Sequence, residues 1–351
     1  MKIIFKRTTP TYRNQLTTQQ VMLYLTATLV VVSLFSVGYY FTLGADYGIK
    51  ALLMIIASVV AAYLCEAGYF YLLKEKDIKK AVNNSFPYVT AILFALILPI
   101  GTPYYVVVFG SIFSILIGKL LFGGFGQNIF NPALIGRVFV MMSYGDKLTA
   151  VLPGKAVDGV ASATPTTIMS MGSWMGDSNI SLANLYLGFY KGSIGETFAL
   201  IIIIAGVFLA MKKVLDWRLP VFYIGTSFVI AFIAGMTHGL SPLHFALVHI
   251  GIGGLVFGGI FMLTDPVTSP VDPFGKILFA VGAAFFTMLL RFRSNMPEGV
   301  LYSILIMNML TPMIDKYTVK PTNKDESRKL IIVIAAMLVC SLLIALVWKG
   351  A

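Results

Sequence analysis

The chain is short of charge and nearly free of cysteine. Only 12% of its 351 residues are charged, and its two cysteines, Cys65 and Cys340, both lie inside apolar runs. A soluble globular domain carries roughly 25% charged residues, so this composition excludes that class. No CxxC spacing or disulfide pattern is present. Two thiols also cannot hold an iron–sulfur cluster alone, because such a cluster typically takes four thiolates.

Several catalytic signatures are also missing. The sequence has no P-loop, no GxGxxG fingerprint and no nucleophilic triad, which argues against NAD binding or hydrolysis within this chain. The formal net charge of +11 is explained by loop lysines that face anionic lipid. Basic residues are not interleaved with aromatics on a polar face, so we expect no nucleic-acid partner.

Long apolar runs dominate what remains. Val21–Leu43 and Ala51–Leu73 are long enough to cross a hydrocarbon core of about 30 Å. We therefore predict an all-α polytopic membrane protein, with residues 1–351 as a single integral membrane domain. The candidate spans are 21–43, 50–73, 87–100, 104–121, 130–143, 196–211, 219–236, 242–262, 276–290, 298–314 and 329–349; some are short enough to be half-helices or re-entrant segments.

The lysines and arginines predict an orientation. If the N-terminus is cytoplasmic, most of the 26 basic residues fall on the cytoplasmic side, as the positive-inside rule requires. Arg291 and Arg293 run against this bias. Five spans precede the polar gap at 144–195, so we expect that gap to face the extracytoplasmic side.

Two stretches resemble each other at an offset of about 135 residues. The first runs from Pro99 to Pro132 and the second from His238 to Pro266; each has Thr/Ser-Pro before an apolar span, FGG after it, and Asn-Pro or Asp-Pro soon after. This order predicts a duplication, repeat A at about 50–143 and repeat B at about 196–290, although glycine and proline recur at many membrane-helix ends. The spans 104–121 and 242–262 would be equivalent and parallel, with helix breaks at 126–132 and 264–273 near a binding site.

Four separated blocks carry a family resemblance: LFGGFGQNIFNPALIGRVFV, DGVASATPTT, LTDPVTSPVDPFGKILF and PEGVLYSILIMNMLTPMID. Together they resemble the D subunits of the Rnf complex, the ion-translocating ferredoxin:NAD⁺ oxidoreductase. They are similar, more distantly, to the B subunits of the sodium-pumping NADH:quinone oxidoreductase. The resemblance implies about ten transmembrane helices, a helix at 298–314 among them. The charged linker and apolar run at 316–349 depart from it and predict an extra C-terminal helix.

The resemblance also implies a covalent cofactor. In this family a threonine of a D-G-x-S-x-A-T-like sequence carries FMN through a phosphoester bond. The matching positions here are Asp158, Gly159, Ser162, Ala163 and Thr164, with Thr164 as the acceptor and Thr166 and Thr167 as alternatives. Pro165 restricts Thr164 to extended conformations, although by local sequence alone this segment reads as a plain turn before a helix.

The resemblance also implies a function, which depends on this covalent flavin. The chain would be a membrane subunit that relays electrons between the ferredoxin and NAD⁺ branches, coupled to Na⁺ or H⁺ movement and inactive alone. Its partners would be the flavin, iron–sulfur and membrane subunits, a flavin transferase that attaches the FMN, and the lipid bilayer of a prokaryotic cell membrane. A second, non-covalent flavin, riboflavin or FMN, is carried as a further implication.

A few polar residues in apolar surroundings are further candidates. Glu66 lies inside the second span, where a carboxylate is a functional hypothesis by default, although it is near enough to Lys74 to reach interfacial water. Asp265 and Asp272 allow an ion-pathway role or, alternatively, helix capping and turn formation. Asn128 and Asn131 either orient their turn or contact a flavin. We expect no metal site, because the histidines lack ligand spacing. Rival functions are a channel or secondary transporter, and a structural anchor.

Overall fold

The structure is a computed structural model, and it describes residues 16–148, 181–190, 192–293, 299–318 and 326–347. Its named elements over these residues are all helices, which confirms the all-helical class. In the first half they are α1 (Thr18–Leu43), α2 (Ala45–Leu72), α3 (Ile78–Ser85), α4 (Pro87–Leu96), α5 (Tyr104–Leu116), η1 (Leu120–Phe122), α6 (Pro132–Tyr144) and η2 (Gly145–Lys147). In the second half they are α8 (Leu182–Leu187), α9 (Ala199–Met211), α10 (Arg218–Thr237), α11 (Pro242–Gly251), α12 (Leu255–Phe257), η3 (Gly258–Met262), α13 (Pro273–Arg293), α14 (Gly299–Thr318) and α15 (Glu326–Val347).

Five of the described helical segments are long and apolar enough to cross a membrane. They are α1, α2, the stretch from α5 into η1, α10 and α13. A helix suits such a run because it satisfies every backbone hydrogen bond internally, where lipid offers no partner. The pair α11 and α12–η3 also passes together, but it is bent by 66°. The segment 242–262, predicted as one apolar span, is therefore interrupted.

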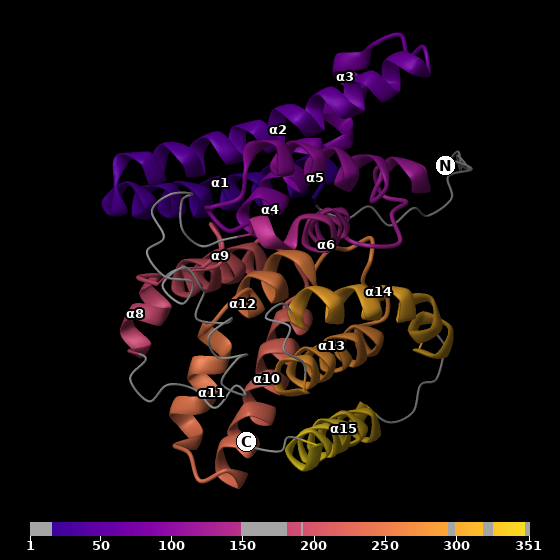
Figure 1. Cartoon of the computed structure of the whole chain (residues 1–351). Helices are drawn as coiled ribbons and strands as arrows, with labels where there is room; N and C mark the ends of the chain where they lie inside the picture. Colours follow the sequence, from indigo (N-terminus) through magenta and orange to yellow (C-terminus); the bar gives the residue numbers. More distant parts are fainter. Residues whose placement is uncertain (1–15, 149–180, 191, 294–298, 319–325, 348–351) are drawn as a thin grey trace, which may run out of the picture.

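The helices form two groups that follow the chain order. Figure 1 shows α1, α2 and α5 across one side of the molecule, and α10, α13, α14 and α15 on the other. Packing relations recur in the two groups: α2 packs on α4 and α5, and α5 on α6, whereas α10 packs on α11 and α13, and α13 on α14. By packing, α5 corresponds to α13, which differs from the predicted pairing of 104–121 with 242–262.

The molecule has two ends, which we name by residues. The Thr18 end is where α1 begins and α2 ends; the Gly44 end is where α1 turns into α2. The segments that border 149–180 lie at the Gly44 end, because Tyr144 contacts Tyr105 at the start of α5 and the Tyr40 hydroxyl donates to the Gly192 carbonyl at 3.2 Å. Neither border lies at the Thr18 end.

Two helices are interrupted, and each interruption receives a buried cation. Between α3 and α4 the chain turns at Phe86, and Lys119, just after α5, donates to the Ser85 carbonyl. Between α11 and α12 it turns at Ile252–Gly254, and Arg291, near the end of α13, donates to the carbonyls of His249 and Ile252. Helix C-termini leave carbonyls without internal partners, so both cations cap a broken helix. Arg291, counted by sequence among the extracytoplasmic loop charges, is buried instead.

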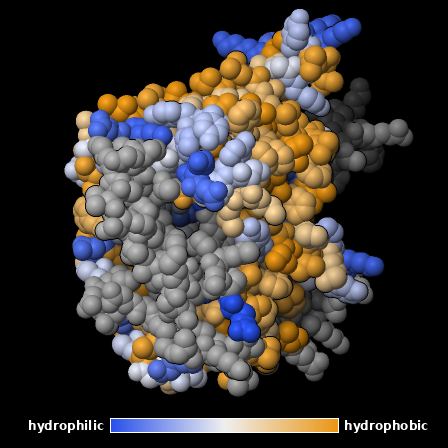
Figure 2. All heavy atoms as spheres, viewed as in Figure 1, coloured by the Kyte–Doolittle hydropathy of each residue, from blue (hydrophilic) through white to orange (hydrophobic). Residues whose placement is uncertain are grey.

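The surface matches a lipid environment. Large apolar side chains are exposed along α1 and α2, including Leu34, Phe35, Leu64 and Leu72. Figure 2 shows apolar side chains over much of the visible described surface, with one group of hydrophilic residues at the top, near α3, and smaller groups elsewhere. Hydropathy does not predict helix α3, because its lysines and asparagines are typical of a loop. It ends in the polar sequence NNS. The extra C-terminal helix exists as α15 and packs on α10 and α13.

Candidate functional site

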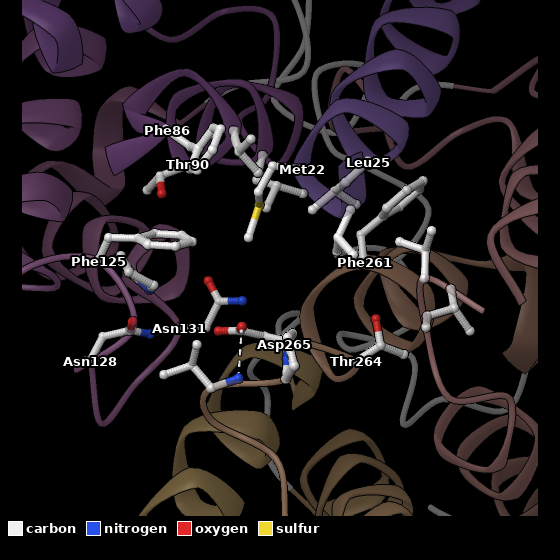
Figure 3. A pocket seen from close by; sticks show the side chains of 18 of the residues that line it. Met22, Leu25, Phe86, Thr90, Phe125, Asn128, Asn131, Phe261, Thr264 and Asp265 are labelled. Carbon is white, nitrogen blue, oxygen red and sulfur yellow. Dashed lines mark hydrogen bonds between the residues drawn. The ribbon is translucent and has the colours of Figure 1, made fainter. Parts of the chain in front are cut away.

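A pocket lies at the Thr18 end, between the two groups of helices. Its walls come from the start of α1, the α3–α4 interruption, the segment between α5 and α6, the end of α9, and the turn after η3 (Figure 3). The lining residues are Val21, Met22, Leu25, Ser85, Phe86, Val89, Thr90, Leu93, Lys119, Phe125, Asn128, Asn131, Pro132, Leu209, Val214, Leu215, Phe261, Thr264, Asp265, Pro266 and Val267. Two turns predicted to be related, GQNIFNP and LTDP, therefore meet in one site.

Asn131 joins the two halves of the chain at the floor of this pocket. Its side-chain oxygen accepts the Ala133 N–H at 3.1 Å and so caps the start of α6. Its side-chain amide donates to the Met262 carbonyl at the end of η3, at 3.3 Å. Because both bonds are buried, either loss would leave a polar group without a partner. Asn131 thus both orients its turn and faces the pocket.

Asp265 lies beside Asn131, as Figure 3 shows. One carboxylate oxygen accepts the Val267 N–H at 3.2 Å, and the other accepts the Thr268 hydroxyl at 3.4 Å. Burial raises the pKa of this carboxyl group, while hydrogen bonds from Val267, Thr268 and Asn128 oppose that shift. Asp265 therefore forms the predicted turn and also presents an acid to the pocket.

Aromatic rings form the facing wall. The Phe86 and Phe125 ring centroids are 5.2 Å apart at an interplanar angle of 59°. Phe86 adopts a left-handed conformation, with φ of 54°, directly before Pro87. A bulky residue in this region costs of order 1–3 kcal/mol, and such strain clusters at functional sites. The strained residue lies at the interruption between α3 and α4, where it places the Phe86 ring at the pocket.

One ion pair supplies the cation of the site. The Lys119 ammonium lies 2.6 Å from the Glu66 carboxylate, and both side chains are buried. Lys119 lines the pocket and Glu66 lies behind it, on α2. Glu66 was predicted as a candidate near enough to Lys74 to reach interfacial water; in the structure it is fully buried and pairs with Lys119. Sequence reasoning counted Lys119 as a loop charge, although its position within an apolar run was a signal.

The remaining predicted residues lie elsewhere. Asp272 accepts the backbone N–H groups of Phe274 at 2.9 Å and Gly275 at 3.2 Å, so it caps α13 and does not line the pocket. The residues predicted for the covalent flavin fall outside the described residues: Asp158, Gly159, Ser162, Ala163 and Thr164. Within the described residues, no group of three His, Cys, Asp or Glu side chains could hold a metal ion.

The pocket suits a flat, mostly apolar ring with a polar edge. Ligand sites usually combine apolar walls with a few polar groups, and the lining of this pocket has that composition. Phe86, Phe125 and Met22 provide the walls, and Asn128 and Asp265 the polar groups. A ring system would require flexible lining side chains such as Met22 to move aside.

Comparison with known proteins identifies relatives over most of the chain. The model of the "NQR2, RnfD, RnfE family" matches residues 6–324. The D subunit of the proton-translocating ferredoxin:NAD(+) oxidoreductase complex of Clostridium ljungdahlii is 38% identical over 284 residues, covering 78% of this chain and 84% of that protein. The D subunit of the Na(+)-translocating complex of Acetobacterium woodii is 36% identical over 277 residues, covering 78% and 83%. The B subunit of the Na(+)-translocating NADH-quinone reductase of Ectopseudomonas mendocina is 34% identical over 273 residues, covering 76% and 67%.

Proposed function

The chain belongs to the NQR2, RnfD, RnfE family, as its sequence blocks indicated, and we propose that it is the membrane subunit of an ion-translocating ferredoxin:NAD⁺ oxidoreductase complex. The observation that carries this proposal is the similarity to D subunits of such complexes over 78% of the chain. The family and the apolar helices make it a multi-pass membrane protein. In this role it works with flavin, iron–sulfur and other membrane subunits and has no turnover alone.

Within that complex the chain carries covalent FMN on Thr164. The support is the D-G-x-S-x-A-T-like sequence from Asp158 to Thr164, in a chain of the family where such a threonine is the acceptor. A flavin transferase attaches the FMN phosphate to the threonine oxygen. Its sequence neighbours Ser162 and Ala163 are small, which suits access by that enzyme.

The pocket at the Thr18 end binds a second flavin without a covalent bond. Its aromatic walls and its Asn128, Asn131 and Asp265 side chains fit the two faces and the hydrogen-bonding edge of an isoalloxazine ring. When bound, the flavin supplies the redox chemistry. The chain contributes the ring's position, its electrostatic surroundings and its separation from water.

The two flavins lie towards opposite membrane surfaces in this proposal. The lysine-rich Thr18 end faces the cytoplasm, following the positive-inside rule. The segments that border 149–180 pack at the Gly44 end, which supports an extracytoplasmic position for the Thr164 flavin. Electrons then cross between them, coupled to Na⁺ or H⁺. Glu66, Asp265 and Asp272 stay proposals for the ion path, and Glu66 is the strongest because it is buried within a span.

A gel experiment tests the covalent flavin. The full chain is co-expressed with the flavin transferase, denatured and examined for flavin fluorescence that migrates with the polypeptide. We expect a fluorescent band that Thr164→Val abolishes, whereas the matched variants Thr166→Val and Thr167→Val retain it. A colourless wild-type chain would contradict the covalent site and favour a transporter or anchor. Fluorescence that persists in Thr164→Val would show that the flavin is attached to another residue.

Riboflavin titration tests the pocket. The full chain, expressed without the transferase and purified in detergent, should quench riboflavin fluorescence as it binds. Phe125→Ala removes one wall, and we expect a loss of about tenfold in affinity, because an aromatic contact is worth about 0.5–1.5 kcal/mol beyond area burial. Phe113→Ala is the control, since that ring stacks on Phe139 at 4.1 Å and does not line the pocket. Equal losses in both variants would contradict the assignment.

A further inference from the structure

Two charged side chains stand among the described residues that line the pocket, the acid Asp265 and the cation Lys119. Lys119 is only 3% exposed. Its ammonium lies 5.7 Å from the centroid of the Phe125 ring, which forms a wall of the pocket. The positive charge therefore adjoins the position that a flat ligand against Phe125 would take.

The surroundings of Lys119 explain why a charged amine is stable there. It donates to Glu66 at 2.6 Å and to the Ser85 carbonyl, which ends α3. A helix C-terminus carries partial negative charge and favours a cation, and a buried charge needs such partners. An ammonium has three N–H donors, and the described contacts account for two of them. Of the two residues in this ion pair, Lys119 lines the pocket and Glu66 does not.

A fixed cation beside the pocket favours a ligand that gains negative charge. Two-electron reduction of a flavin, with uptake of one proton from water, leaves the ring with one more negative charge than before. No bond to the protein forms, and the electrons come from an external reductant. Nearby charge is one of the means by which a protein tunes a flavin, and charges interact more strongly at a buried site than in water.

We propose that Lys119 sets the electron affinity of the pocket, because it stabilises the reduced, anionic flavin over the oxidised one, with Glu66 as the residue that positions it. This inference rests on the non-covalent flavin of the proposed function. The inference concerns the ratio of two affinities, that for the reduced flavin and that for the oxidised flavin. Lys119 raises the affinity for the reduced form, relative to that for the oxidised form, by about tenfold or more, which corresponds to about 30 mV for a two-electron couple.

The experiment measures the redox potential of bound riboflavin. Full-length chain expressed without the transferase is loaded with riboflavin and titrated with dithionite while the flavin absorbance is followed, and affinity for oxidised riboflavin is measured by fluorescence. Lys119→Met removes the cation. Lys119→Arg retains it. The double variant Lys119→Met, Glu66→Met replaces the whole pair with apolar side chains, a change that often preserves or improves stability.

We expect the potential to fall by about 30 mV or more in Lys119→Met and to stay near the wild-type value in Lys119→Arg. The double variant should show a smaller fall, because it also removes the Glu66 carboxylate, with its thermal stability restored. This separates loss of the charge from loss of the fold. An unchanged potential in the double variant overturns the inference, as does a shift in Lys119→Arg equal to that in Lys119→Met. A wild-type chain that binds no riboflavin overturns the pocket assignment and this inference together, while the Thr164 experiment stands apart.

Discussion

At the residue scale, the Glu66–Lys119 pair places two charges in the buried interior of the first group of helices. Each charge alone would be strongly unfavourable in an apolar interior, and the pair is tolerated because its charges cancel over 2.6 Å. We expect Lys119→Met alone to destabilise the protein by about 3–5 kcal/mol, since it strands a buried carboxylate. The double Met variant should recover most of that loss. Thermal unfolding in detergent checks both; a double variant no more stable than the single one would contradict this account.

Asp265 gives the molecule a pH-dependent term. Its pKa is raised from the ordinary value of 3.8, chiefly by burial. A group with a raised pKa stabilises the folded state fully below its unfolded pKa, and that stabilisation is lost as pH rises through the folded pKa. The contribution of Asp265 to the stability of the wild-type chain should therefore fall as pH rises above 3.8 through that raised pKa.

Asp265→Asn removes this term while keeping the side-chain shape. We expect the variant to lose less stability than the wild-type chain over the same rise in pH. Thermal unfolding at a series of pH values measures the difference. Asp272→Asn is the matched control, because that carboxylate also caps backbone N–H groups but does not line the pocket. Parallel curves for wild type and Asp265→Asn would contradict the burial argument.

Individual site residues could be predicted where a polar side chain lies within an otherwise apolar stretch of the sequence. Asn128, Asn131 and Asp265 stood out as polar residues in glycine- and proline-marked turns, and the structure brings them to one pocket. Lys119 was counted as a loop charge, because it lies near the end of an apolar run, and Arg291 stood out only as an exception to the positive-inside bias. Only tertiary packing shows that each is directed to the open carbonyls of a helix elsewhere in the chain.

At the scale of elements, the interruption between α11 and α12 depends on one backbone conformation. Gly253 has φ of 67°, in the region where an L-residue costs roughly 1–2 kcal/mol. We expect Gly253→Ala to destabilise the protein by about that amount. Gly225→Ala is the control: it lies inside α10 with nothing within 4 Å of an added Cβ, so alanine should be neutral or stabilising there. Equal unfolding temperatures for both variants would contradict the requirement for glycine.

Hydropathy predicted elements well where a run is both long and continuous. Helices α1, α2, α10 and α13 begin and end within a few residues of the predicted spans. It failed at 242–262, because the glycines at the bend are also common in unbroken membrane helices. Gly253 permits the 66° bend, but the glycines alone do not predict it, since the bend is also stabilised by Arg291 from α13.

At the scale of the whole molecule, α15 is a separable addition. It lies beyond residue 324, where the family match ends, and it packs on α10 and α13, away from every element that lines the pocket. We expect a chain truncated after residue 324 to bind riboflavin with wild-type affinity and to unfold at a lower temperature, because the covered faces of α10 and α13 become exposed. Loss of riboflavin binding on truncation would show that α15 supports the site.

The pocket also imposes an order on assembly. Its floor is closed by one amide, Asn131, on a carbonyl of Met262, so its two sides are synthesised more than a hundred residues apart. At the usual 5–20 residues per second of translation, the ribosome needs roughly 7–26 s to pass from the first side to the second. No cofactor can be enclosed during that interval. Nascent chains stalled before residue 262 should therefore remain colourless in the presence of riboflavin. Bound riboflavin would then mark chains in which both sides of the pocket have been synthesised.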